Sequence, residues 1–463
     1  MNDSNRNSKT LQRRSLVILL LMFTIVSCDD FLDVGPPKAK VTDASVFSDE
    51  STAVSAVLGI YYKMYGSGKF ASGGERGVST LTGLSSDELK NYPQTDAVVL
   101  QFERNELQGD NPLVLALWNS LYETLFQANA VLEGINSASQ IPNATINQLT
   151  GEVLFIRAFC HFYLLNLFGD VPLVITTDYR LNSSIARTAS EDVYNQIVTD
   201  LQRAIEVLRK EYPTNERIRP NRFAAVALLS RVQLFMGNWS LAEHYATEVI
   251  EDGAYIMEDL STVFLSGSQE AIWQLRPPSS NAGYTSEGFI FNDYNAPRNN
   301  VLRADFVDIY SPEDERLTNW LRTIEHQSDF ILLPYKYKDS SAGDLEEYSV
   351  VLRLAEQYLI RAEARARQNN IDGGLEDLNV IRSRASLTQL DLSDKEELLM
   401  EVFRERRREL FTEWGHRWFD LKRTGAAVSE LDKEQPVSPH ALLYPVPEGE
   451  RSKNGRLEQN PGY

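Results

Sequence analysis

Cysteine is nearly absent from this chain of 463 residues, since only Cys28 and Cys160 occur. Cys160 lies in an apolar stretch with helical spacing, at residues 157–163. A thiol in such a stretch is expected to be buried and unreactive. With a single cysteine outside the N-terminal segment, no disulfide can join two core thiols, so a disulfide-based scaffold is excluded.

Catalytic motifs are also lacking. The sequence contains no H-E-x-x-H, no G-x-S-x-G and no paired C-x-x-C. Its histidines are scattered without the spacing of metal ligands, at His161, His244, His326, His416 and His440. In so acidic a chain, two carboxylates could meet as in a glycosidase, or carboxylates and carbonyls could form a structural calcium site, but no spacing supports either. We therefore expect neither enzymatic activity nor a metal or other cofactor.

Basic residues are fewer than acidic ones: the chain has 46 Lys and Arg and 65 Asp and Glu, which gives a net charge of −19. A chain with this balance is repelled by the phosphate backbone of nucleic acids. Nucleic acid is thus excluded as a general partner. Acidity of this kind keeps a surface protein soluble and says little else.

The N-terminus has the organisation of a signal peptide. Four basic residues precede an apolar run of eleven residues, 16–26, which is too short to span a bilayer comfortably. The run ends at Ser27-Cys28, which predicts cleavage after residue 27 and lipidation of Cys28 as a membrane anchor. The alternative is an ordinary secretory signal with an incidental cysteine. We expect a signal peptide at 1–27, a tether at 28–45 and one domain at 46–463.

Helical periodicity dominates the remaining sequence, and β-type alternation is scarce. Apolar residues recur at three- and four-residue spacing, which predicts an all-α protein with helices at 50–65, 112–135, 146–168, 190–209, 221–252, 349–386 and 394–411. Trp414, Trp418 and Phe419 are expected to be core residues. Along 394–411, the pairs Glu401–Arg404, Glu405–Arg408 and Arg406–Glu409 have the spacing of ion pairs on a helix surface.

Two segments have the pattern of a repeated helix pair. At 223–249 and at 354–381, two helical stretches flank a short turn, and two small residues lie twelve positions apart: Ser230 with Ala242, and Ala362 with Gly374. Small residues at that spacing let two antiparallel helices approach closely, as in tetratricopeptide repeats. The stretches 50–65 with 112–135, and 146–168 with 190–209, could be two further pairs with long insertions. Generic helical hairpins are the alternative.

Short motifs are distributed along nearly the whole chain beyond Cys28. They are Asp29-Asp30-Phe31-Leu32-Asp33, residues 157–164, residues 167–173, residues 351–356, residues 361–364, residues 378–382, residues 405–421, Tyr444-Pro445-Val446-Pro447 and residues 459–463. In type, order and spacing these segments resemble the SusD/RagB family, and 405–421 is the strongest of them.

The resemblance implies a fold and a role. It implies a single domain built on four tetratricopeptide-like helix pairs, with long loop insertions and an irregular C-terminal half packed on them. Within this domain it implies an N-terminal helical-repeat part at 46–255 and a C-terminal part at 256–463. It also implies an outer-membrane lipoprotein facing the cell exterior. Such a protein captures oligosaccharide or polysaccharide and delivers it to a SusC-like TonB-dependent transporter. Asp29 and Asp30 resemble the surface-export signal of Bacteroidetes lipoproteins.

Two long inserted segments, 66–111 and 276–348, are the expected ligand-binding loops, because they are irregular, polar and rich in aromatic residues. Sugars present apolar faces and a rim of hydroxyls, so their sites combine exposed rings with amide, carboxylate and guanidinium groups. The candidate binding residues are Asp87, Glu88, Asn91, Tyr92, Tyr284, Asn292, Tyr294, Asn295, Arg298 and Trp320. We expect Tyr284, Tyr294 and Tyr92 to stack on the ligand.

Three alternatives remain open at this point. The aromatic residues could instead pack their own loops or face the transporter. The ligand could be a peptide, as for peptide-importing members of the same family, although a peptide site should rely more on backbone pairing. A tetratricopeptide-type scaffold without a small ligand is the third, but the interrupted repeats and inserted loops would cover its usual binding surface.

Overall fold

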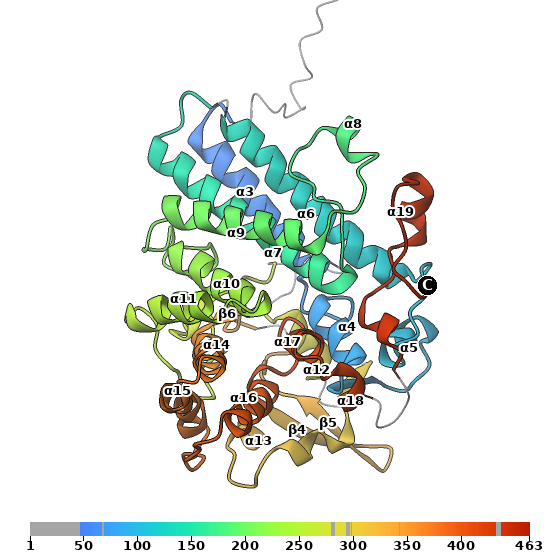
Figure 1. Ribbon diagram of the computed structural model, residues 1–463, viewed down its shortest axis with the longest axis vertical. Helices are drawn as coiled ribbons and strands as arrows, with labels where there is room; N and C mark the ends of the chain where they lie inside the picture. Colours follow the sequence, from blue (N-terminus) through green and yellow to red (C-terminus); the bar gives the residue numbers. More distant parts are fainter. Residues whose placement is uncertain are drawn as a thin grey trace, which may run out of the picture. The chain divides into compact units, whose positions relative to one another are not determined.

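Helices form most of the chain in the computed structural model. It describes residues 47–463 apart from 67–68, 137, 279–282, 293–296, 298, 342 and 432–436. The expected signal peptide, Cys28 and the tether lie outside the described residues. Residues 47–463 group as one unit, and Figure 1 shows the order of its helices.

Four long helices pack side by side in the N-terminal part (Figure 1). They are α3 (Glu50–Tyr65), α6 (Pro112–Asn136), α7 (Asn143–Phe168) and α9 (Ser190–Val207). In the part of the chain that the structure describes, only α7 is long and apolar enough to cross a membrane, but 94% of its apolar window is buried within the protein. A helix that is apolar on all sides and surrounded by other helices is a core helix. The expected pairs 50–65 with 112–135 and 146–168 with 190–209 do pack against each other.

A second group of helices continues from this layer. It contains α10 (Arg222–Phe235), α11 (Trp239–Glu251), α14 (Leu354–Arg367), α15 (Ile371–Arg384) and α16 (Lys395–Leu410). The two expected helix hairpins are present as α10–α11 and α14–α15, each with a short turn between its helices. A Cβ on Gly374 would lie 2.9 Å from the backbone oxygen of Ala362. The close approach of these two helices therefore depends on glycine at 374.

The close packing of α14 and α15 at Gly374 predicts opposite effects of alanine at two helical glycines. Gly374→Ala should lower the free energy of unfolding by about 1–3 kcal/mol, because the added methyl group must displace backbone of α14. A Cβ on Gly59 in α3 would meet nothing within 4 Å, so Gly59→Ala should raise stability by about 0.5–1 kcal/mol through helix propensity. Urea denaturation measures both. Equal effects of the two substitutions would contradict the close packing at Gly374.

The expected all-α architecture holds for the bulk of the protein, but the described residues also contain short strands in three antiparallel pairs. These are β1 (Leu89–Asn91) with β3 (Asn300–Leu302), β2 (Ala271–Leu275) with β6 (Ser349–Arg353), and β4 (Leu321–His326) with β5 (Asp329–Pro334). Strands of three to six residues are too short for alternation to be recognised, and two of the pairs join distant segments.

The remaining short helices are α4 (Val78–Ser85), α5 (Ala97–Glu103), α8 (Tyr179–Asn182), α12 (Ser286–Phe291), α13 (Arg316–Asn319), α17 (His416–Arg423), α18 (Ala427–Leu431), α19 (Glu448–Lys453) and the 3-10 helices Ala304–Ile309 and Pro439–Leu442.

A buried network of charges ties α16 to its neighbours. Glu409 is completely buried, and its carboxylate contacts Arg316 at 3.1 Å, Arg353 at 2.5 Å, and Arg384. Each guanidinium also contacts a further carboxylate; Arg384, for example, lies 2.8 Å from Glu270. Of the expected surface pairs, Glu401–Arg404 forms near the surface, whereas Glu405–Arg408 forms with the Glu405 side chain buried. The pair Arg406–Glu409 was wrong, because both side chains point into the protein, where Arg406 binds Asp420 instead.

The expected core aromatics are confirmed. Trp414, Trp418 and Phe419 are all buried. Trp414 Nε1 donates a hydrogen bond of 2.8 Å to the backbone oxygen of Val350. These residues follow α16 and begin α17, so the strongest sequence signature of the chain lies in its interior.

Candidate functional site

The two long inserted segments meet through the β1–β3 ladder. Leu89 pairs with Leu302 and Asn91 pairs with Asn300. Just beyond the ladder, the Arg303 amide donates to the Glu88 carbonyl at 3.0 Å, and the Tyr92 amide donates to the Asn299 carbonyl at 2.7 Å. Residues separated by about two hundred positions in sequence are thus fixed side by side.

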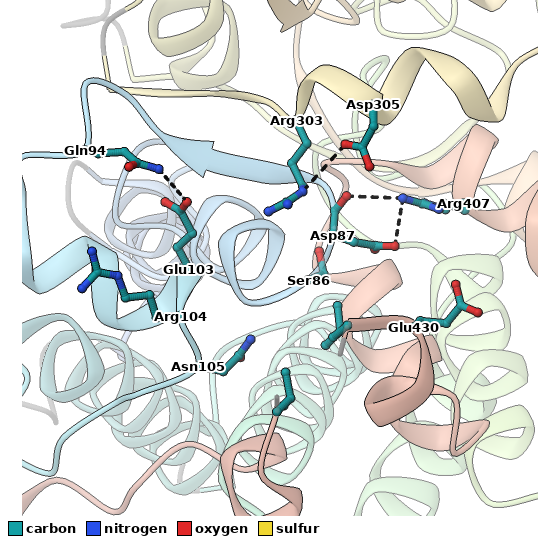
Figure 2. Close-up of a pocket in the computed structure, with 12 residues that line it drawn as sticks. Ser86, Asp87, Gln94, Glu103, Arg104, Asn105, Arg303, Asp305, Arg407 and Glu430 are labelled. Atoms are coloured by element: carbon teal, nitrogen blue, oxygen red, sulfur yellow. Dashed lines mark hydrogen bonds and ion pairs between the residues drawn. The ribbon is translucent and has the colours of Figure 1, made fainter. Parts of the chain in front are cut away.

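A polar cavity of about 290 Å³ opens beside this ladder (Figure 2). Nearly all of the described residues that line it carry polar or charged side chains, and no aromatic ring is among them. The lining residues are Ser86, Asp87, Gln94, Glu103, Arg104, Asn105, Arg303, Asp305, Arg407, Glu430, Leu431 and Val437. They come from the loops after α4 and β1, from the end of α5 and the residues after it, from the segment after β3, from α16, and from α18 and the segment after it.

Asp87 forms one wall of the cavity and is held by two arginines. Arg417 donates to both carboxylate oxygens at 2.7 Å, and Arg407 lies 2.8 Å away. Burial alone would raise the pKa of Asp87, but the hydrogen bonds and charge of Arg417 and the charge of Arg407 hold it below its usual value. Asp87 is therefore an ionised hydrogen-bond acceptor in a fixed position.

The other walls present amide and guanidinium groups. Asn105 has a φ of +54° and its Nδ2 donates to the Ser85 carbonyl at 3.1 Å, which leaves its side-chain oxygen for another partner. Gln94 Nε2 donates to Glu103 at 3.1 Å. Arg104 is exposed at the rim, and Figure 2 shows Arg303 reaching into the cavity from the opposite side. Arg303 Nε lies 3.8 Å from Asp305 and forms an ion pair with it. The arrangement suits a ligand rich in hydroxyl groups.

Two family models match the chain. The model described as "Starch-binding associating with outer membrane" matches residues 30–234, and the model described as "SusD family" matches residues 308–463. Together these matches cover well over half of the sequence. The chain belongs to the SusD family.

Named relatives and solved structures agree with this family. SusD-like protein P25 of Formosa agariphila is 24% identical, over 93% of this chain and 95% of the relative. SusD-like protein P2 of the same organism is 25% identical, over 98% of this chain and all of the relative. A SusD superfamily structure from Bacteroides thetaiotaomicron has a TM-score of 0.78 at 23% identity, over 89% of this chain and 99% of that one. A structure named "Laminarin binding SusD-like protein" has a TM-score of 0.79 at 21% identity, over 90% and 100%. The expected family and SusD-like fold are confirmed.

Several residues expected to bind a ligand are buried in this SusD-family protein. Trp320 is completely buried, and its Nε1 donates to the Leu260 carbonyl at 2.8 Å. The Lys336 ammonium lies 4.8 Å from its ring. The assignment of Trp320 as a ligand-binding residue is therefore corrected, because its ring has no exposed face and contributes to the core.

Three polar candidates are likewise turned inward. Asn91 Nδ2 donates to the Asn299 carbonyl at 3.0 Å, and Asn292 Nδ2 donates to the Tyr337 carbonyl. Glu88 is 3% exposed and accepts a hydrogen bond of 3.1 Å from the Thr412 amide. These side chains hold the loops in place, so direct ligand contact by Glu88, Asn91 and Asn292 is corrected to a structural role.

The two described tyrosines are half-buried. Tyr92 lies edge-on to His326, with ring centroids 6.5 Å apart, and Tyr284 stacks on Phe289 at 5.2 Å. Tyr284 therefore packs against its own loop and Tyr92 packs against the other inserted segment, although each keeps part of its surface in solvent. Tyr294, Asn295 and Arg298 lie outside the described residues, and their binding role stays a prediction.

Asp87 is the one candidate that lines the cavity. The sequence reasoning missed Gln94, Arg104, Asn105 and Arg303. The only signal available for them was their location in or next to the two expected binding loops. Among the described residues, no cluster of three or more His, Cys, Asp or Glu has the geometry to hold a metal ion.

The burial of Glu88 predicts how the free energy of unfolding depends on pH. Burial raises the pKa of Glu88 to about 7, so the folded protein favours its neutral form. The stability from this group is present at pH values below its unfolded pKa and is lost as the pH rises through 7. Glu88→Gln should therefore gain about 2 kcal/mol relative to the wild type between pH 5 and pH 8.

Urea denaturation at several pH values measures this difference. Glu106→Gln, at an exposed position near the same cavity, is the control and should track the wild type at every pH. A Glu88→Gln variant that also tracks the wild type would show that Glu88 ionises normally in the folded protein.

Proposed function

We propose that this SusD-family chain is a non-catalytic, surface-exposed lipoprotein that binds oligosaccharide or polysaccharide and delivers it to a SusC-like TonB-dependent transporter in the outer membrane. The observation that carries the proposal is the polar cavity beside the β1–β3 ladder, which combines a fixed carboxylate with amide and guanidinium groups. Adjacent hydroxyls of a sugar can bond such planar groups in pairs. The laminarin-binding description of one structural relative supports a glycan as the ligand class.

The chemistry of the cavity supports binding rather than glycoside cleavage. A glycosidase needs one carboxylic acid with a raised pKa and a second carboxylate across the scissile bond. The pKa of Asp87 is lowered and both of its oxygens are held by Arg417. Glu88, with its raised pKa, is buried away from the cavity. Asp87 is therefore suited to accept hydrogen bonds from a sugar rather than to donate a proton to it.

Delivery to a transporter rests on the N-terminus and on the family. The apolar run that ends at Cys28 predicts a lipid anchor, and one matching family model is described as associating with the outer membrane. An anchored binding protein raises the local concentration of captured ligand at a barrel beside it.

A binding screen of residues 29–463 tests the function. The soluble chain is run through native gels that contain laminarin, amylopectin, arabinoxylan, pectin or host mucin glycans. Calorimetry with a peptide digest and product analysis of the bound glycans complete the screen. Retardation by at least one glycan without cleavage is expected. Binding to peptides alone, release of cleavage products, or no binding to any probe would each overturn the proposed function.

A further inference from the structure

A second cavity adjoins the polar cavity. Its volume is about 810 Å³, and it shares Arg104 and Asn105 with the polar cavity as a common wall. The other lining residues are Gln101, Glu106, Leu107, Gln108, Ser438, His440, Gly462 and Tyr463. This cavity contains the feature that the polar cavity lacks, namely aromatic rings at the surface.

Tyr463 is the aromatic residue of this second cavity, and the chain positions it firmly. Its side chain is 37% exposed, its hydroxyl donates to the Leu443 carbonyl at 2.8 Å, and its ring stands edge-on to His440 with centroids 5.4 Å apart. Gly462 has a φ of +100°, and a Cβ there would lie 2.5 Å from His440 Cγ. Only glycine lets the chain turn close enough to His440 to set the tyrosine ring there.

The turn before Tyr463 is fixed to the core. Asn460 is buried, and its Nδ2 donates to the Phe168 carbonyl at 2.9 Å and to the Tyr444 carbonyl at 2.8 Å. The ring is thus held by a preformed support rather than by a free chain end. A rigid aromatic surface binds an apolar sugar face at low entropic cost.

Amide groups line the path between the ring and the polar cavity. Gln101 Oε1 accepts hydrogen bonds from Asn111 Nδ2 at 2.8 Å and from the Gln108 amide at 3.1 Å, which fixes the orientation of its amide. Asn105 and Arg104 follow at the shared wall (Figure 2). Ring, amides and guanidinium therefore line two adjoining cavities that share Arg104 and Asn105.

We propose that the glycan site extends through both cavities, so that the ligand is an extended oligosaccharide with one part in the polar cavity and the next sugars stacked on Tyr463. This inference rests on the proposed function. A short oligomer fills the polar cavity alone, whereas a longer one also reaches the ring. Affinity therefore rises with chain length until both cavities are occupied.

Calorimetry on a series of oligomers tests this inference. The series contains two to eight sugar units and is prepared from whichever glycan of the screen retards the wild-type chain most. Tyr463→Ala should weaken binding of the long oligomers by about 3- to 10-fold and leave the shortest binding oligomer within about twofold. Tyr463→Phe keeps the ring and loses only the hydroxyl bond to Leu443, so it should retain the dependence on length. Circular dichroism confirms that each variant is folded.

The outcomes separate the two proposals. If Tyr463→Ala binds every oligomer as the wild type does, or loses affinity equally at all lengths, the extended site is wrong while the glycan-binding function stands. If both Tyr463→Ala and Tyr463→Phe lose the dependence on length, the hydroxyl bond and not the ring is responsible, and stacking is wrong. If the wild-type chain binds no glycan, both proposals fall together.

Discussion

Replacing Glu409 by glutamine is expected to lower the free energy of unfolding by about 3–5 kcal/mol. The substitution leaves the three guanidinium groups of Arg316, Arg353 and Arg384 buried around an uncharged partner. Each guanidinium keeps a second carboxylate, but it loses the one charge that all three share while its cost of desolvation stays the same. Chemical denaturation of the wild type and the variant measures the change.

Glu401 offers a matched control on the same helix. It pairs with Arg404, whose side chain is 53% exposed, and exposed pairs contribute about 0–1 kcal/mol. Glu401→Gln should therefore change stability by less than about 0.5 kcal/mol. If the two substitutions had equal effects, the charges around Glu409 would contribute no more than a surface pair.

The charges around Glu409 also predict the pH range in which acid destabilises the protein. Burial would raise the pKa of Glu409, but Arg384, Arg353 and Arg316 hold it far below its usual value. The stability from Glu409 is thus present above the unfolded pKa of a glutamate and is lost only as the pH falls toward the lowered value. The destabilisation by Glu409→Gln should accordingly be largest near neutral pH and shrink in strong acid.

The second large effect concerns ligand binding. A double variant with Arg303→Ala and Asn105→Ala removes a guanidinium and an amide from opposite sides of the polar cavity. Hydrogen bonds to charged groups contribute about 1.5–3 kcal/mol, so the affinity for the bound glycan should fall at least about tenfold. Calorimetry with the glycan found in the screen measures this affinity.

Arg203 in α9 supplies the control for this experiment. It is an exposed arginine outside both cavities, and it pairs with Glu206 on its own helix. Arg203→Ala should bind as the wild type does. Undiminished binding by the double variant would place the glycan elsewhere on the protein.

The helices of this fold could be predicted from the sequence, because each long helix repeats its apolar residues over many turns. The hairpins α10–α11 and α14–α15 were also predictable, because small residues at a spacing of twelve indicate a close helix crossing, as Gly374 shows. The spacing of apolar residues could not reveal the β1–β3 ladder, since the two strands lie about two hundred positions apart in the sequence.

The candidate site was predictable only as a region. Long polar insertions indicated which loops form it, and Asp87 does line the cavity. Composition could not tell which side chains face inward. Trp320, Glu88 and Asn91 are residues of the types that line sugar-binding sites, but tertiary contacts bury all three side chains. Conversely, Arg303 reaches the cavity because β3 pairs with β1, which local sequence does not encode.

Amide hydrogen exchange with and without the bound glycan tests most directly that the polar cavity is where this protein holds its ligand. We predict slower exchange upon binding in residues 92–105 and 303–307, which line or flank the cavity, and unchanged exchange in α9 and α11 on the helical layers. Saturated binding that leaves exchange in 92–105 and 303–307 unchanged would contradict the account and assign the ligand to another surface.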